Sequence, residues 1–188
     1  MDVVSRVLAF WYNEPNSDLA ADGEHRKAWF VKDPDFDAAI REKFADDVAA
    51  AARGDHDALR DTPEGCLALC ILMDQFPRNL FRGSAQAFAT DPAALAIARS
   101  AIQRGLHEGL GKTRKLFLYL PFEHSENLAD QNTSVQLFKA KGDPATYPYA
   151  LEHYYVISRF GRFPGRNAAL GRDTTAEEAA FLEAFGAY

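Results

Sequence analysis

Cysteine is scarce in this sequence, and long apolar runs are missing from it. Only 2 of its 188 residues are cysteines, too few for the disulfide framework of a small secreted protein. Cys66 and Cys70 stand on an expected helix and are predicted to be buried thiols, with a disulfide or a shared metal as the alternative. The longest strongly apolar run, residues 66–73, is far too short to span a bilayer. With no signal peptide expected either, these absences predict a cytoplasmic protein without a membrane partner.

Strand-like patterning and an excess of basic residues are missing as well. No stretch alternates apolar and polar residues with a period of two, which argues against a sheet. The 21 lysines and arginines are outnumbered by 27 acidic residues, giving a formal net charge of -6. A general nucleic-acid-binding protein carries a basic footprint, so no nucleic-acid partner is expected. The sequence also contains no Gly-x-Ser-x-Gly motif, which argues against a hydrolase of the type that places its nucleophilic serine there.

Apolar residues at helical spacing are what the sequence does contain. Asp33 and Pro34 suit the start of a helix, apolar residues follow every four positions, and Gly54 suits its end. The same reasoning predicts helices over residues 3–12, 33–54, 62–76, 91–105, 113–120, 128–142, 148–160 and 174–185, with a loop over 13–23. The sequence therefore predicts an all-α fold. We expect one domain over residues 1–188, built as a compact stack or bundle of antiparallel helices.

Two prolines and a capping motif set the expected ends of three of these helices. Pro77 is expected to end the helix that begins at Pro63, and Pro121 the one that begins at Thr113. Residues 174–177 fit a capping box, with Thr174 as the N-cap of the last helix and Glu177 as its partner.

A short basic segment, residues 159–172, is the strongest functional signal. It has no acidic residue and is interrupted by Gly161, Pro164 and Gly165. Its four cations are Arg159, Arg162, Arg166 and Arg172. Such a cluster needs either carboxylates of the same chain or a bound anion among the guanidinium groups. Because the segment has no Gly-Lys-Ser/Thr, nucleotide hydrolysis by a P-loop is not indicated.

An earlier segment, residues 74–83, repeats the order Phe-Pro-Arg-Asn followed by another arginine. Arg78, Asn79 and Arg82 lie in it, and Asp74 precedes them on an apolar helix face. A carboxylate on such a face is costly unless it is paired, so Arg78 or Arg82 is its expected partner. Asp74 is then either half of a structural ion pair or the acid or base of a site.

Titratable and amide side chains also gather just after the apolar run that ends at Pro121. His124 could act as a general base, a metal ligand or a hydrogen-bond donor. Ser125 and Glu126 could simply cap the helix that follows. His153 lies on the apolar face of its helix, where a histidine is more often a hydrogen-bonded core residue than a catalyst. A metal held by His124, Glu123, Glu126, Asp130 and His153 is an alternative, but their spacing matches no usual ligand pattern, so we predict no metal or other cofactor.

Several short motifs occur in order over nearly the whole chain: Phe10-Trp11-Tyr12, Trp29-Phe30, Asp74 to Asn79 with Arg82-Gly83, Tyr119 to Phe122 with His124 to Glu126, Gln131, His153, Arg159 to Pro164, Arg166-Asn167, and Leu170 to Arg172. Together they resemble the uncharacterised bacterial family called domain of unknown function 924. The resemblance implies an all-α, tetratricopeptide-like fold, a cytoplasmic location and no established activity. The family commonly carries histidine where this chain has Gly165.

Two functional hypotheses follow. In the first, a pocket binds a small anionic molecule that bears phosphate or carboxylate, with hydrolysis or group transfer as the chemistry. Its catalytic candidates are Asp74, His124 and Glu126. Its ligand-binding candidates are Gln75, Arg78, Asn79, Arg82, Gln131, His153, Arg159, Arg162, Arg166, Asn167 and Arg172. In the second, the chain is a non-catalytic helical scaffold for a protein or peptide, and the same groups form a structural network.

Overall fold

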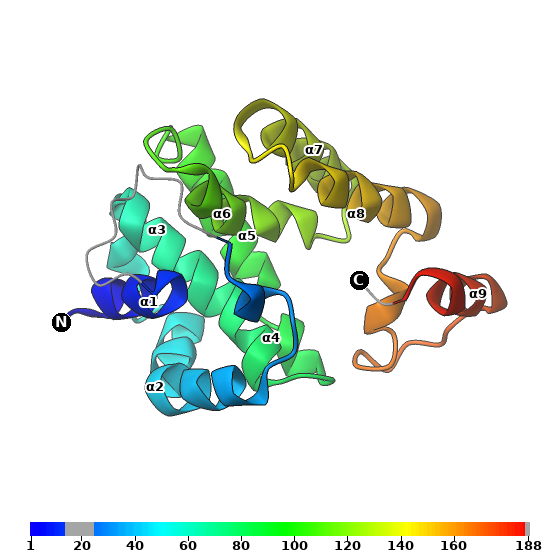
Figure 1. Cartoon of the computed structure of the whole chain (residues 1–188), viewed down its shortest axis with the longest axis horizontal. Coiled ribbons are helices and arrows are strands. Elements are labelled where there is room, and N and C mark those ends of the chain that lie inside the picture. Colours follow the sequence, from blue (N-terminus) through cyan, green and yellow to red (C-terminus); the bar gives the residue numbers. More distant parts are fainter. Residues whose placement is uncertain (14–24, 187–188) are drawn as a thin grey trace.

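A computed structural model describes residues 1–13 and 25–186 (Figure 1). Most of the loop expected at 13–23 therefore lies outside the described residues. The helices are α1 (Val3–Tyr12), α2 (Pro34–Arg53), α3 (Pro63–Cys70), α4 (Phe76–Leu80), α5 (Asp91–Gln103), α6 (Lys112–Glu123), α7 (Leu128–Lys141), α8 (Tyr147–Phe160) and α9 (Ala176–Phe185). No strand occurs within these two ranges, and the all-α prediction is confirmed.

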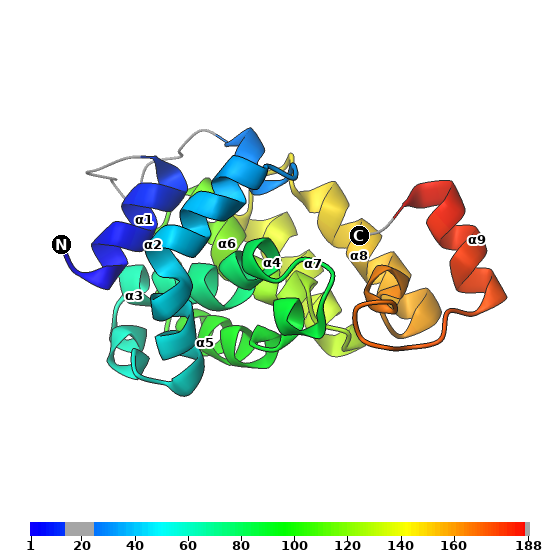
Figure 2. The same cartoon turned by 90° about the horizontal axis from the view of Figure 1, so that it is seen from below.

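Helices α1, α2 and α3 lie together at one end of the molecule (Figures 1 and 2). Helices α1 and α9 lie at opposite ends of its long axis, and α6, α7 and α8 pack against one another in turn (Figures 1 and 2). No helix in the described part of the chain is long and apolar enough to cross a membrane. The single domain and the tetratricopeptide-like arrangement stay predictions.

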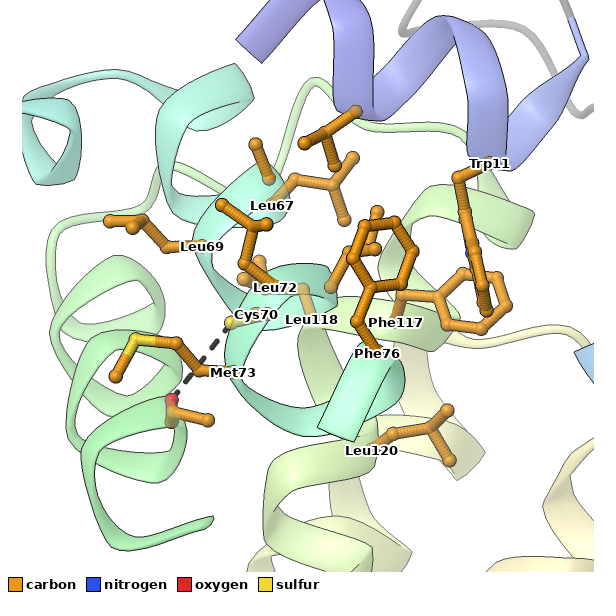
Figure 3. Close-up of a cluster of buried hydrophobic side chains, with 14 of the residues drawn as sticks. Trp11, Leu67, Leu69, Cys70, Leu72, Met73, Phe76, Phe117, Leu118 and Leu120 are labelled. Atoms are coloured by element: carbon orange, nitrogen blue, oxygen red, sulfur yellow. Dashed lines mark hydrogen bonds between the residues drawn. The ribbon is translucent and has the colours of Figure 1, made fainter. Parts of the chain in front are cut away.

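The main core is built around α3, whose residues from Gly65 to Cys70 are all buried. The aromatic rings beside it meet edge to face: the Trp11 centroid lies 5.1 Å from that of Phe117 and 5.6 Å from that of Phe76 (Figure 3). Cys70 is a buried free thiol whose Sγ lies 3.9 Å from the Ala94 carbonyl oxygen (Figure 3). These contacts join α1 to α4 and α6, and α3 to α5, and α3 also packs directly against α6.

Two prolines do not end helices where the sequence predicts it. Residues 71–75 form a π-helical turn, and the Phe76 amide donates to the carbonyl of Ile71. The chain then enters α4 with Pro77 in the first turn, where a missing N–H costs little. Likewise, Pro121 lies inside α6, which runs to Glu123. Both predictions were wrong because the surrounding packing carries the helical path past the proline.

The capping box of α9 lies one residue later than predicted. Thr175 is the N-cap, and its side chain and that of Glu178 exchange hydrogen bonds with each other's backbone amides. Glu178 also accepts hydrogen bonds from Nε and Nη2 of Arg162, so the acid of the capping box is the one that pairs with the basic segment. The capping box therefore starts at Thr175, which lets Glu178 also pair with Arg162. The local sequence pattern does not reveal this second role.

Candidate active site

The π-helical turn places Asp74 fully inside the protein, with 0% of its surface exposed. Such turns insert an extra residue into a helix and are frequent at functional sites. The Nδ1 atom of His124 lies 2.8 Å from Oδ1 of Asp74 and 2.9 Å from Oδ2. His124 follows the last residue of α6, so the helix that continues past Pro121 delivers it to this carboxylate.

Charge fixes the proton positions in this Asp74–His124 pair. Burial acts to raise the pKa of Asp74, but the charge of Arg78 and the hydrogen bond from His124 hold it well below its usual range. Burial, aided by Arg78, lowers the pKa of His124 to about 4, so its imidazole is neutral at pH 7. An ionised carboxylate only accepts hydrogen bonds, so Nδ1 donates and Nε2 carries the lone pair. Among the described residues, no group forms a hydrogen bond with Nε2.

Gln75 and Arg78 complete the surroundings of the Asp74 carboxylate. The Gln75 side-chain amide donates to Oδ2 of Asp74, and the Nη1 atom of Arg78 lies 3.3 Å from Oδ1. Arg78 makes its main pairing elsewhere, because its Nη1 and Nη2 donate to the two carboxylate oxygens of Asp91 at 2.9 Å each. Arg78 therefore holds Asp74 and Asp91 together.

Arg166, from the basic segment, also lies beside His124 and Asp91, but it is paired less closely with a carboxylate than Arg78 is. Its Nη2 donates to the His124 carbonyl at 2.9 Å, and its Nη1 lies 3.5 Å from Oδ2 of Asp91. The guanidinium carbon lies 4.5 Å from the ring centre of Phe163 and 4.8 Å from that of Phe88. Burial and the neighbouring Arg78 lower the pKa of Arg166 to about 10. A buried cation in this state favours an added negative charge.

Glu123 is a second buried carboxyl group of the site, and it is only 4% exposed. Its Oε1 lies 3.4 Å from Nδ1 of His153, and Oε2 has no hydrogen-bond partner within residues 1–13 and 25–186. Burial, with repulsion from Asp74 and Glu152, raises its pKa to about 8. At pH 7 Glu123 is therefore mainly a protonated acid. The sequence predicts Glu123 only as an alternative metal ligand, although an acid at the end of an apolar run is a signal of a buried carboxyl group.

His153 is neutral at pH 7 and lies close to both His124 and Glu123. Its Nδ1 donates to the Tyr149 carbonyl at 2.9 Å, one turn earlier in α8. Burial lowers its pKa to about 4. The centre of its ring lies 6.3 Å from that of His124.

Two cavities adjoin these groups. The first has a volume of about 510 Å³ and the second about 580 Å³. Both are lined by Trp29, Phe30, Gln75, Arg78, His124 and His153. The first alone is lined by His25, Leu116, Leu120, Glu123, Ala145, Thr146 and Tyr149. The second alone is lined by Asn79, Arg82, Gly83, Ala87, Phe88, Phe163 and Arg166. His124 thus lies in the wall that the two cavities share, and Asp74, which lines neither, is buried beside it.

The other arginine candidates are paired with carboxylates. Arg82, although it lines the second cavity, donates to both oxygens of Asp37 at 2.6 and 2.8 Å. Arg162 donates to both oxygens of Glu178 at 2.7 and 2.9 Å. Arg159 is exposed and pairs with Glu177 on the surface. Together with the Arg172–Glu126 pair, the pairs of Arg159 and Arg162 account for three of the four cations of the basic segment without a ligand.

Glu126 and its neighbours hold the basic segment in place. Glu126 accepts two hydrogen bonds from Arg172, at 2.7 and 3.0 Å, and one from the Phe163 amide at 2.8 Å. Asn167 contacts Arg172, Thr174 and Glu178, and Gln131 donates to backbone carbonyls that include those of Glu123 and Ser125. The predicted site residues that line neither cavity are Asp74, Glu126, Gln131, Arg159, Arg162, Asn167 and Arg172. Gly165 is exposed and lines neither cavity.

The metal alternative has no structural counterpart in the part of the chain that is described. Within it, no group of three or more histidine, cysteine, aspartate or glutamate side chains is arranged to hold a metal ion. The site that does exist is a buried carboxylate–imidazole pair with two arginines and a protonated carboxyl.

The structure is that of an all-helical protein with a buried Asp74–His124 pair beside two adjoining cavities. A family model described as "Bacterial protein of unknown function" (domain of unknown function 924) matches residues 7–186, and the chain belongs to this family. A protein of unknown function from Agrobacterium tumefaciens has a similar solved structure, with 38% sequence identity and a TM-score of 0.87 over 97% of each chain. No curated protein matches the chain.

Proposed function

We propose that the protein binds a small anionic molecule, bearing phosphate or carboxylate, in the second cavity at Arg166. The observation that carries this proposal is the weak pairing of a buried guanidinium. Arg82 and Arg162 each have a two-point carboxylate partner, whereas the nearest carboxylate oxygen to Arg166 is 3.5 Å away. A phosphate or carboxylate there gains two parallel, charge-assisted hydrogen bonds in a partly desolvated place.

The chemistry that suits the site is hydrolysis or group transfer with His124 as general base. Asp74 fixes the ring so that Nε2 presents its lone pair. Nε2 takes the proton of a water or hydroxyl group while that oxygen attacks the bound phosphoryl or carbonyl centre. The leaving group then departs with a proton returned from the imidazolium, which the Asp74 carboxylate stabilises. Arg166 holds the negative charge of the bound group.

The alternative is a helical scaffold that binds a protein or peptide. The bidentate ion pairs of Arg82 with Asp37 and of Arg162 with Glu178 favour this scaffold, because both arginines hold segments of the chain together. Exposed Leu151 and Tyr155, one turn apart on α8, would serve such a partner. This alternative requires no ligand at Arg166.

Arg166→Gln tests the proposal by thermal melting with inorganic phosphate, acetate and other small anions. A ligand at about 100 times its Kd adds about 2.7 kcal/mol to the stability of the wild type, which raises Tm by about 5–10 °C. We expect this rise to disappear in Arg166→Gln. The matched control, Arg159→Gln, should keep it, because Arg159 is a surface arginine that lines neither cavity. An equal rise in all three proteins, or no rise with any anion, would contradict the proposal.

A further inference from the structure

The two cavities differ in chemical character although they share the wall around His124. The groups found only in the second cavity include Asn79, Arg82 and Arg166. Those found only in the first include Leu116, Leu120 and the Tyr149 ring. A ligand whose reacting group lies at His124 can therefore reach into a polar space on one side and a largely apolar one on the other.

The first cavity has the size and lining of a small-molecule site. Its volume of about 510 Å³ falls within the range of about 300–1,000 Å³ that is usual for such sites. Trp29 and Phe30 cover both cavities, so an aromatic wall continues from one to the other. Phosphate or acetate alone fills little of this space.

Glu123 provides an independent sign of a ligand in the first cavity. Its carboxyl group is almost completely buried in the cavity wall, and Oε2 has no hydrogen-bond partner among the described residues. Buried polar atoms are normally paired, so an unpaired one beside a cavity points to a partner that binds there. Because burial raises the pKa of Glu123 to about 8, its carboxyl group can donate a hydrogen bond at pH 7.

We propose that the ligand is a small amphipathic anion whose charged group binds Arg166 and whose apolar body fills the first cavity. The body carries an uncharged hydrogen-bond acceptor, such as a carbonyl oxygen, that faces Glu123. This inference rests on the proposed function and names the class of molecule that the same site accepts. It identifies a ligand with a charged end, a reacting group near His124 and an apolar body bearing one acceptor.

The test uses straight-chain carboxylates from acetate to octanoate, with Kd measured by calorimetry at pH 7. Each added methylene group that enters the apolar cavity should lower Kd by about fourfold. Ala145→Trp should abolish this dependence on length, because Ala145 is an exposed residue of the first cavity wall and its replacement fills that space. Ala140→Trp is the matched control, since Ala140 is exposed on α7 and lines neither cavity.

A second series tests the acceptor. Among octanoates that carry a single oxo group at positions 4 to 7, at least one should bind about fivefold to tenfold more tightly than octanoate. Glu123→Leu should remove this gain and keep the dependence on chain length. Equal affinity of the whole oxo series and octanoate would overturn the acceptor at Glu123.

The outcomes separate this inference from the proposed function. If acetate and phosphate bind through Arg166 but longer chains bind no better, the amphipathic ligand is wrong and the anion site stands. If the length dependence survives in Ala145→Trp, the apolar body does not lie in the first cavity, and the inference is overturned. If no anion of any length binds, both proposals fail.

Discussion

Asp74→Ala is expected to lower the free energy of unfolding by about 3–5 kcal/mol. The substitution removes the acceptor of the His124 Nδ1–H and of the Gln75 amide, and both donors are then left without it inside the protein. It also removes one of the two carboxylates beside Arg78, which retains Asp91. Urea denaturation followed by circular dichroism at pH 7 measures the loss.

Asp55→Ala is the matched control for this measurement. Asp55 pairs with Arg53 at the surface, where both side chains are more than half exposed. Exposed pairs contribute about 0–1 kcal/mol, so this variant should be nearly as stable as the wild type. If Asp74→Ala lost no more than the control, the buried pair would not contribute to stability, and its assignment as a tightly bonded dyad would be wrong.

Glu123→Gln is expected to change how stability depends on pH. The pKa of Glu123 is about 8 in the folded protein and near 4.5, its ordinary value, in the unfolded chain. Between these two values the folded state holds a proton that the unfolded state releases, so raising the pH destabilises the wild type. Glutamine is uncharged throughout. The variant should therefore gain stability relative to the wild type as pH rises, by up to about 5 kcal/mol at pH 8.

The comparison isolates Glu123 because other titrating groups act alike in both proteins. Burial lowers the pKa values of His124 and His153 to about 4, so they increase stability as pH rises from about 4 towards 6.5. This contribution cancels when the variant is compared with the wild type at each pH. Urea denaturation at intervals from pH 5 to pH 8.5 gives the difference in the free energy of unfolding between the variant and the wild type. Glu183→Gln, at an exposed position, is the control, and its difference from the wild type should not change over this range. A constant difference for Glu123→Gln would mean that Glu123 ionises normally.

Local sequence signals account for most of the helix boundaries. Asp33 accepts hydrogen bonds from the amides of the first turn of α2, and Gly54 ends that helix in a left-handed conformation, as the residue types predict. Pro77 and Pro121 show the limit of such signals. A proline restricts only its immediate neighbours, whereas the π-helical turn before Pro77 and the continuation of α6 past Pro121 occur in segments that tertiary packing buries.

The candidate site could be predicted in part. The apolar helix face around Asp74 and the titratable cluster after Pro121, which contains His124, indicate the two residues. Their bond, however, joins residues 50 positions apart and depends on the packing of α3 against α6. The raised pKa of Glu123 arises from burial, which the sequence alone does not give. The arginines required either carboxylates or an anion, and only the tertiary structure shows that Arg162 has Glu178 whereas the nearest carboxylate oxygen to Arg166 is 3.5 Å away.

We expect His124 to be a neutral base, fixed by Asp74 beside an anion site. The most direct measurement is the ring ¹⁵N chemical shifts of His124 from pH 5 to pH 8, with and without saturating phosphate or octanoate. We predict a protonated Nδ1 and an unprotonated Nε2 throughout this range, and an Nε2 shift that the anion changes in the wild type but not in Arg166→Gln. A protonated Nε2 at pH 7, or a signal that no anion changes, would contradict the account.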